Sequence, residues 1–323
     1  MRSVFLNTTV LILVAAIGAG GLCGCAGGKQ ATPAPQAPAP VQPAQQAQAE
    51  PPAFPVTLAD GMEREVKIPS RPSRVVSMVP AATEMLFALG AGDRVVGVTK
   101  FCDYPAAAQE KAQIGDYTNP SVEKIVSLRP DLVVGDFIHP ELATRLGSMG
   151  IPVFLLNSQT VAETVRAIRL IGKAIGEEKA ATALAAQMES RVAAIRAKVE
   201  TIPEASRPKV FHEMWDEPLM TSGPGTIMDD LIRLAGGVNV AADAKTLYPK
   251  YSLESLVAKN PDVIVYTFHN DIAQTTGKGW AGITAVKEGR VYQLTDDLVS
   301  RPGPRIIDGL EELARKLHPE LFK

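Results

Sequence analysis

The sequence predicts an α/β fold of two lobes with short, largely parallel sheets flanked by helices, joined by one long rigid α-helix. Three observations lead to this prediction. Short β-branched runs alternate with helical segments, which is typical of parallel α/β sheets. A long stretch at 177–200 contains neither Gly nor Pro, and one helix-and-strand segment occurs twice along the chain.

The expected strands are short runs of Val, Ile, Leu, Phe and Tyr bounded by turn residues. Such continuous apolar runs are typical of strands that are buried on both faces. They fall into two groups that lie on either side of the long helical stretch. The runs are 75–79, 95–98, 132–134, 153–156, 210–211, 263–266 and 291–292.

The stretch at 177–200 is rich in Ala, Glu, Lys and other strong helix formers. At about 1.5 Å per residue, a helix of this length spans on the order of 35 Å, enough to run across two lobes. We therefore predict an N-terminal lobe at 56–160, a helical connection at 161–206 and a C-terminal lobe at 207–323.

The repeated segment supports two lobes of similar construction. Residues 121–134 read SVEKIVSLRPDLVV and residues 252–265 read SLESLVAKNPDVIV, at an offset of 131 (252 minus 121). In each copy, apolar residues at helical spacing precede a Pro-Asp turn and a buried strand. A helix, a Pro-Asp turn and a strand also form a common connection, but Ser, Glu, Val, Pro, Asp and Val match in register, which favours duplication of a lobe.

The first 24 residues have the features of a lipoprotein signal peptide. A short positive start precedes an uncharged apolar run that ends in small residues. The Leu22-Cys23-Gly24-Cys25 segment resembles the bacterial lipobox, which makes Cys25 the acylated first residue of the mature protein. The alternative is an uncleaved transmembrane helix, because the uncharged run is about long enough to span a bilayer.

Residues 25–55 are predicted to form a tether between the lipid anchor and the folded body. The run from Ala31 to Pro55 consists mostly of Pro, Ala and Gln. Such a composition cannot bury a core and favours extended polyproline conformations. A surface-tethered receptor and a tethered enzyme would share this arrangement.

Composition excludes one class of partner. The formal net charge is −2 at pH 7, so no basic surplus indicates nucleic-acid binding.

Cys102 is the only cysteine beyond the N-terminal pair, so the folded body cannot form an internal disulfide.

Motifs for catalysis are absent from the sequence. The sequence contains no P-loop, no G-x-G-x-x-G directly after a strand and no G-x-S-x-G elbow, and His212-Glu213 lacks the second histidine of H-E-x-x-H. A zinc site would require His139, His212 and His269 to converge. We expect no catalytic residues, no resident metal and no cofactor, although a ligand could carry cobalt or iron.

Aromatic residues make up only 5% of the chain, and several follow the predicted strands. Ligands of parallel α/β sheets bind beyond the carboxyl ends of strands. Scattered loop aromatics facing one cleft would form a wide wall suited to a large planar or macrocyclic ligand. The residues after strands are Phe101, Tyr104, Phe137, Trp215, Phe268 and His269, and those before the repeat helices are Tyr117, Tyr248 and Tyr251.

Several segments together resemble the vitamin B12, haem and siderophore binding proteins of ABC importers, the helical-backbone class of periplasmic binding proteins. The Cys-Asp-Tyr-Pro segment is most similar to the cobalamin-binding branch. The resemblance implies two α/β lobes joined by one long helix. The segments are the lipobox, VVSMVPAATE at 75–84, FCDYP at 101–105, IGDY at 114–117, the repeat, TSG at 221–223 and RPGPR at 301–305.

The resemblance also implies two sets of functional residues. Glu123 and Glu254 occupy positions at which one glutamate per lobe docks onto arginines of the permease; their place at helix N-termini, where acidic residues are common, is the alternative explanation. Met220 stands where the family holds an aromatic residue. The implied ligand-binding residues are Phe101, Tyr117, Phe137, Trp215, Tyr248, Asp297 and Arg301.

The predicted function is therefore extracytoplasmic binding of a corrinoid, cobalamin or cobinamide, for delivery to an ABC importer. The expected protein is a lipid-anchored monomer whose partners are its ligand, a permease dimer and the membrane. A haem or ferric-siderophore receptor is the alternative within the family. A tethered metal-binding protein or hydrolase, and a sensory or adhesive lipoprotein, are the alternatives outside it.

Overall fold

The computed structural model describes residues 54–267 and 279–322. The predicted signal peptide, Cys25, most of the tether, and Phe268 with His269 lie outside the described residues. Within the described part, no helix is both long and apolar enough to cross a membrane.

The N-terminal lobe is built on a five-stranded parallel sheet in the order β5-β4-β3-β6-β7. An antiparallel hairpin, β1 (Val56–Ala59) with β2 (Glu65–Ile68), precedes it. The strands are β3 (Val75–Ser77), β4 (Val95–Val98), β5 (Ala112–Gln113), β6 (Leu132–Asp136) and β7 (Val153–Leu156). The helices are α1 (Pro80–Ala88), η1 (Gly92–Arg94), η2 (Ala106–Ala108), α2 (Val122–Ser127), α3 (Pro140–Ser148) and α4 (Val161–Ile175).

The C-terminal lobe holds a four-stranded parallel sheet in the order β11-β8-β12-β13 and a small hairpin of β9 with β10. The strands are β8 (Lys209–Glu213), β9 (Trp215–Asp216), β10 (Leu219–Met220), β11 (Val238–Asn239), β12 (Val263–Tyr266) and β13 (Val291–Gln293). The helices are η3 (Glu204–Ser206), α6 (Ile227–Leu234), α7 (Leu253–Lys259), α9 (Thr284–Lys287), α10 (Asp296–Ser300) and α11 (Ile306–Leu317).

These elements confirm the predicted fold class. A strand lies at each of the seven expected runs. The first run is shorter than predicted: β3 ends at Ser77, and Val79 is instead the N-cap of α1. Pro80 explains this boundary, because proline fits the first turn of a helix and donates no ladder hydrogen bond.

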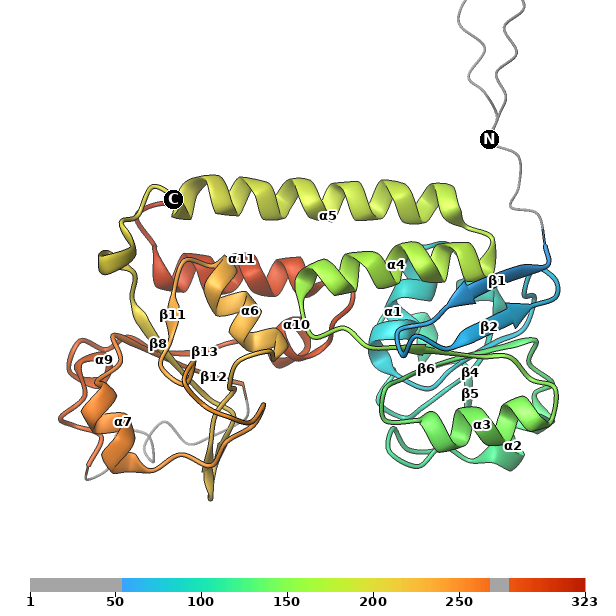
Figure 1. Cartoon of the computed structure of the whole chain (residues 1–323), viewed down its shortest axis with the longest axis horizontal. Coiled ribbons are helices and arrows are strands. Elements are labelled where there is room, and N and C mark those ends of the chain that lie inside the picture. Colours follow the sequence, from blue (N-terminus) through green and yellow to red (C-terminus); the bar gives the residue numbers. More distant parts are fainter. Residues whose placement is uncertain (1–53, 268–278, 323) are drawn as a thin grey trace, which may run out of the picture. The chain divides into compact units, whose positions relative to one another are not determined.

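The long helix α5 (Glu178–Val199) spans both lobes, and α4 lies between it and the N-terminal sheet (Figure 1). Its start is fastened to the N-terminal lobe, where Glu177 accepts hydrogen bonds from Arg94 at 2.7 Å and Arg71 at 2.5 Å. Farther along, Arg191 forms ion pairs with two residues of α11, Asp308 at 2.7 Å and Glu311 at 2.9 Å. Ion pairs at these points thus hold α5 on both lobes.

The two repeat copies have the same local structure. Ser121 and Ser252 are the N-caps of α2 and α7, each accepting from the backbone N–H three residues on. Arg129 and Asn260, which are 131 residues apart, both adopt the left-handed conformation, with φ of 46° and 45°. Such conformations are uncommon outside glycine. Their recurrence at equivalent positions supports the duplication.

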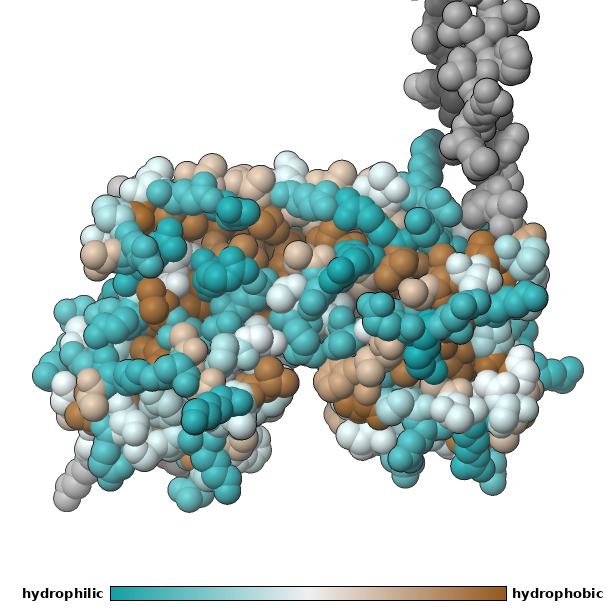
Figure 2. All heavy atoms as spheres, viewed as in Figure 1, coloured by the Kyte–Doolittle hydropathy of each residue, from teal (hydrophilic) through white to brown (hydrophobic). Residues whose placement is uncertain are grey.

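Buried apolar side chains form one cluster that runs from the N-terminal sheet through α4 and α5 into the C-terminal helices α6 and α11. A second, smaller cluster lies within the C-terminal lobe around Phe211 and Ile264. Figure 2 shows hydrophobic residues beneath α5 along its length. The helical connection is therefore part of the core rather than a linker.

Candidate ligand-binding cleft

A cavity of about 460 Å³ is lined by residues of both lobes. In the N-terminal lobe, Asp136 ends β6 and Leu156 ends β7, so the cavity lies at the carboxyl edge of the sheet, where ligands of parallel sheets bind. Figure 2 shows a hollow between the lobes on the side away from α5, with hydrophobic residues on both rims. The side chains that give this cavity its polarity and its apolar wall are Phe101, Tyr117, Asp136, Phe137, Ser158, Asp296, Asp297, Ser300 and Arg301.

Tyr117 is held in place by two groups of the N-terminal lobe. Its hydroxyl donates to Asp136 Oδ2 at 2.8 Å, and its ring meets the edge of the His139 ring at 5.8 Å between centroids. His139 Nε2 bonds the Tyr117 carbonyl at 2.7 Å. Burial, then the Asp136 carboxylate and the nearby Tyr248 hydroxyl, raise the pKa of Tyr117, so it stays a neutral donor. Tyr248 belongs to the C-terminal lobe, so the pKa of Tyr117 depends on both lobes.

The opposite wall comes from α10 and the loop that follows it. Arg301 forms ion pairs with Asp297 at 2.7 Å and with Asp103 of the N-terminal lobe at 2.5 Å. The hydrogen bond from Arg301 keeps the pKa of Asp103 below its usual range. Arg301 is thus already neutralised, and its charge binds the two lobes together at the rim of the cleft.

A second cavity, of about 320 Å³, continues on the C-terminal side. Asp296 and Ser300 line both cavities, so the two adjoin at α10. Tyr248 and His212 line only the second. The cleft therefore has two chambers that meet at Asp296 and Ser300 of α10.

Two buried polar atoms lining these chambers have no hydrogen-bond partner in the described structure. They are Ser158 Oγ in the first chamber and His212 Nε2 in the second. The other ring nitrogen of His212 is bonded to Ser222 Oγ at 2.8 Å. Because leaving a buried polar atom unpaired costs about 1–3 kcal/mol, both atoms are candidates for contact with a ligand.

His212 also predicts how stability depends on pH. Burial lowers its pKa to about 4, whereas an unfolded histidine titrates near 6.5. Between these values only the unfolded state takes up the proton, so stability is lost as pH falls from about 6.5 towards 4. We expect the free energy of unfolding of the parent protein to fall between pH 7 and pH 5. In His212→Gln this fall should be smaller by about 2 kcal/mol, measured by urea unfolding at the two pH values. Equal pH dependence in variant and parent would contradict this assignment.

The RPGPR segment at 301–305 brings a second arginine to the lobe contact. Arg305 donates to both oxygens of Glu84 on α1, at 2.9 and 2.6 Å. The Arg305 guanidinium also lies over the Tyr104 ring, 3.8 Å from its centroid. A Cβ on Gly303 would lie 3.3 Å from Glu84 Oε2, so glycine permits this close approach. Both arginines of the segment thus reach the N-terminal lobe.

The structure brings together most of the predicted ligand-binding residues. Phe101, Tyr117, Phe137, Asp297 and Arg301 line the first chamber, and a sixth, Tyr248, lines the second. The seventh, Trp215, lines neither chamber; its indole donates to the Glu217 carbonyl at 2.9 Å. Of the other loop aromatics, Tyr251 packs against the Phe211 ring and belongs to the C-terminal core.

His139 and Cys102, on which a metal site or a reactive thiol would depend, have other contacts in the structure. His139 is engaged by Asp136 and the Tyr117 backbone, and no group of three metal-ligating side chains occurs in the described ranges 54–267 and 279–322; His269 lies outside them. Cys102 is buried beside Thr99, and burial raises the pKa of its thiol, which disfavours the reactive thiolate.

Sequence reasoning missed several residues of the cleft. Asp136 ends β6 and Ser158 follows the neighbouring strand β7, so attention to polar as well as aromatic residues at the ends of strands could have found them. Asp296 gave no such signal, because its position between the chambers depends on how α10 sits against both lobes. Glu84 and Arg305 lie in segments that carried the resemblance, but their pairing across the lobes required the structure.

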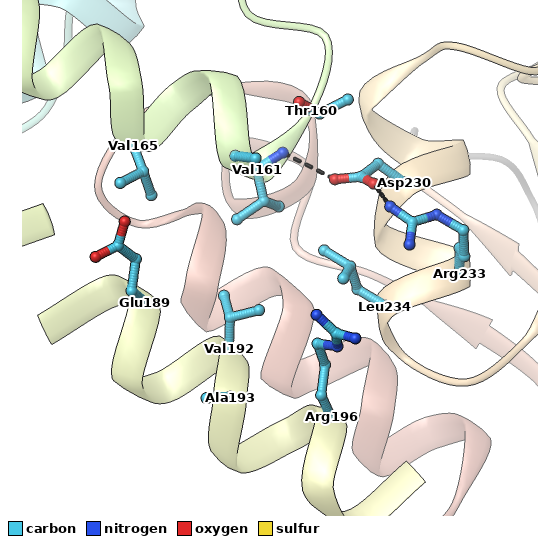
Figure 3. Close-up of a pocket in the computed structure, with 11 residues that line it drawn as sticks. Thr160, Val161, Val165, Glu189, Val192, Ala193, Arg196, Asp230, Arg233 and Leu234 are labelled. Carbon is cyan, nitrogen blue, oxygen red and sulfur yellow. Dashed lines mark hydrogen bonds and ion pairs between the residues drawn. The ribbon is translucent and has the colours of Figure 1, made fainter. Parts of the chain in front are cut away.

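A further cavity lies away from the cleft, in the joint between α4, α5 and α6 (Figure 3). Asp230 accepts from the Val161 backbone N–H at 2.9 Å and pairs with Arg233. The other two charged side chains on its walls are also paired, Glu189 with Arg169 and Arg196 with Glu200. Because these charges satisfy one another, the joint is better suited to holding the helices together than to binding a charged ligand.

The predicted docking glutamates, Glu123 and Glu254, lie in the first turns of α2 and α7 and are exposed. Both helices lie on the side of the molecule away from α5, one on each lobe (Figure 1). Three residues after each glutamate is an exposed valine, Val126 or Val257. Residues at this spacing share a helix face, so each lobe presents a carboxylate beside an apolar side chain.

Comparison with known proteins shows which family has this architecture. The periplasmic binding protein family model matches residues 75–298. An uncharacterised ABC transporter substrate-binding lipoprotein of Bacillus subtilis, YvrC, is 38% identical over 86% of this chain and 90% of its own. A cobalamin-binding protein of Halobacterium salinarum is 34% identical over 82% of this chain and 75% of its own.

Solved structures agree with these relatives. The periplasmic vitamin B12 binding protein BtuF of Vibrio cholerae aligns with a TM-score of 0.69 at 27% identity, covering 77% of this chain and 98% of its own. The periplasmic heme-binding protein RhuT of Roseiflexus sp. RS-1 aligns with a TM-score of 0.67 at 30% identity, covering 77% and 99%. The chain belongs to the periplasmic binding protein family.

Proposed function

We propose that this protein is the extracytoplasmic substrate-binding component of an ABC importer and that it carries a corrinoid between its two lobes. The observation that carries the proposal is the cleft itself. A cavity at the carboxyl edge of a parallel sheet gathers exposed aromatic side chains, Phe101 and Phe137, with hydroxyl and carboxylate groups. Large exposed apolar side chains in a cleft indicate a binding surface, and this mixture suits a wide ring with polar substituents.

The relatives support a corrinoid as the ligand. The Halobacterium and Vibrio proteins are named for binding cobalamin and vitamin B12. Haem is the second candidate, favoured by the likeness to the Roseiflexus heme-binding protein. The aromatic side chains of the cleft could pack against either ring, so the substituents of the ring must decide between the two ligands.

Docking through Glu123 and Glu254 is part of the proposal. Neither carboxylate forms an ion pair with another residue of the described structure, and the helices that carry them, α2 and α7, lie on the same side of the molecule. A protein with one such carboxylate on each of two similar lobes could meet a two-fold permease with one contact per subunit. Exposed Val126 and Val257 would then cover apolar area beside each charge pair.

The remaining features of the proposal concern the attachment of the protein to the membrane and its oligomeric state. Cys25 carries the lipid, the tether at 25–55 holds the folded body off the membrane, and the protein acts as a monomer without catalysis. Several acyl chains would make the anchor stable, because each buried methylene contributes about 0.8 kcal/mol. Trp215 remains a proposed ligand contact on the hairpin of β9 and β10.

The proposal predicts tight, saturable binding of corrinoids. We expect cyanocobalamin or dicyanocobinamide to bind the purified full-length protein with a Kd of about 1 μM or tighter, as pockets that bury a large ligand allow. Isothermal titration calorimetry with these two corrinoids, haem and a ferric siderophore measures this. Release of the unaltered corrinoid tests the absence of catalysis. Binding of haem alone would overturn the corrinoid assignment, and no binding across the panel would overturn the proposed function.

A further inference from the structure

The junction between the two chambers holds a carboxyl group that the lobe contacts leave free. Asp296 lines both chambers and forms no ion pair with another described residue, whereas its neighbour Asp297 is paired with Arg301. Burial raises the pKa of Asp296, whereas a hydrogen bond from the Ser300 side chain and, more weakly, the charge of Arg301 lower it. A carboxylate has about four acceptor positions, so Asp296 can accept further hydrogen bonds from a ligand beside the one from Ser300.

The chambers on either side hold the two unpartnered polar atoms described above. Ser158 belongs to a side chain only 7% exposed and lines the first chamber, and His212, 4% exposed, lines the second. The low pKa of His212 keeps its ring neutral at pH 7, so its Nε2 is either an N–H donor or a lone-pair acceptor. The junction therefore combines an acceptor, the Asp296 carboxylate, with two groups that can donate a hydrogen bond, the Ser158 hydroxyl and the His212 ring. An amide needs an acceptor for its N–H₂ and a donor for its C=O.

We propose that Asp296 is a specificity-determining residue, which selects ligands with uncharged carboxamide arms and rejects those with carboxylate arms. This inference rests on the proposed function, because it names which kind of ring the cleft carries. An amide N–H₂ can donate to the Asp296 carboxylate while its C=O accepts from Ser158 or from the His212 ring.

A carboxylate arm cannot make the same set of contacts. It has no donor for Asp296, and it would place two negative charges together in a partly desolvated site, which is strongly unfavourable. Arg301 offers little compensation, because it already contacts Asp297 and Asp103. Corrinoids bear primary carboxamides around the ring, whereas haem bears two propionates. The junction thus favours a corrinoid over haem.

The test compares two corrinoids that share one ring and differ in their arms. Dicyanocobinamide carries amides, and a dicyano corrinoid polycarboxylate carries the corresponding acids; cyanide fills both axial positions of the cobalt, so metal coordination does not enter. At pH 7.5 we expect the full-length protein to bind the amide form about 100-fold more tightly by calorimetry, since each tenfold corresponds to about 1.4 kcal/mol.

In Asp296→Asn the ratio of the two dissociation constants should fall about tenfold, mainly because the polycarboxylate binds more tightly. Asp93→Asn, which changes an exposed aspartate of η1 outside the cleft, should leave the ratio unchanged. Equal binding of both corrinoids by the parent protein, or an unchanged ratio in Asp296→Asn, would overturn the inference while leaving the proposed function intact. If neither corrinoid binds, the proposed function itself fails, and the inference with it.

Discussion

Replacing Glu84 by alanine is expected to lower the free energy of unfolding by about 3–5 kcal/mol, because Arg305, which is partly buried at the lobe contact, loses the carboxylate that accepts both of its hydrogen bonds. Glu84 is 3% exposed and accepts two hydrogen bonds from Arg305, with Arg301 at 3.7 Å. Thermal unfolding measures the effect, and a loss of this size lowers the Tm by about 10 °C in a protein of this size.

An exposed arginine–glutamate pair that also has two hydrogen bonds provides the control. Arg169 and Glu189 also form two parallel hydrogen bonds, at 2.9 and 2.8 Å, but both side chains lie at the surface. We expect Glu189→Ala to cost about 1 kcal/mol or less, since solvent and salt screen exposed pairs. Similar losses in the two variants would show that burial of Glu84 is not the source of its effect.

Reversing the charge of both docking glutamates is expected to reduce uptake of the ligand by at least about 100-fold. In Glu123→Lys with Glu254→Lys, each lobe would place a lysine opposite the permease arginines that the proposal requires, and each lost charge pair costs about 2 kcal/mol or more. Uptake by proteoliposomes containing the cognate permease measures this, with ligand affinity measured in parallel by calorimetry.

The affinity should change less than twofold, because neither glutamate lines a chamber of the cleft. The matched control reverses Glu141 and Glu288, which are likewise exposed, one on each lobe. If the control pair reduces uptake as strongly, general surface charge rather than docking at α2 and α7 accounts for the result. If the double variant transports normally, the proposed docking residues are wrong.

Much of the fold followed from local sequence signals. The β-branched runs became strands because they could be buried on both faces of parallel sheets, and the stretch without Gly or Pro became α5. The repeat predicted α2 and α7 together with the strands that follow them. Boundaries were less certain: no periodicity separates Val79 from the strand before it, and only Pro80 indicates where the helix begins.

The cleft was predictable where a residue's position follows from the strand before it. Phe101 and Phe137 lie just beyond strands, and the edge of the sheet brings them together. Asp296 and Glu84 are different, because their environments are created by the other lobe. No local pattern distinguishes Asp296 from the ion-paired Asp297 beside it, since that difference depends on where Arg301 lies.

The apolar cluster that runs from one sheet through α4 and α5 to α11 limits how such proteins can evolve. A lobe that shares its core with the connecting helix is not an interchangeable module. Exchanging one lobe for that of a relative would expose or overfill the facing surface of α5, unless the matching face of the helix came with it. New ligand preferences in this architecture should therefore arise by substitution at the cleft wall, with the lobes inherited as a single unit.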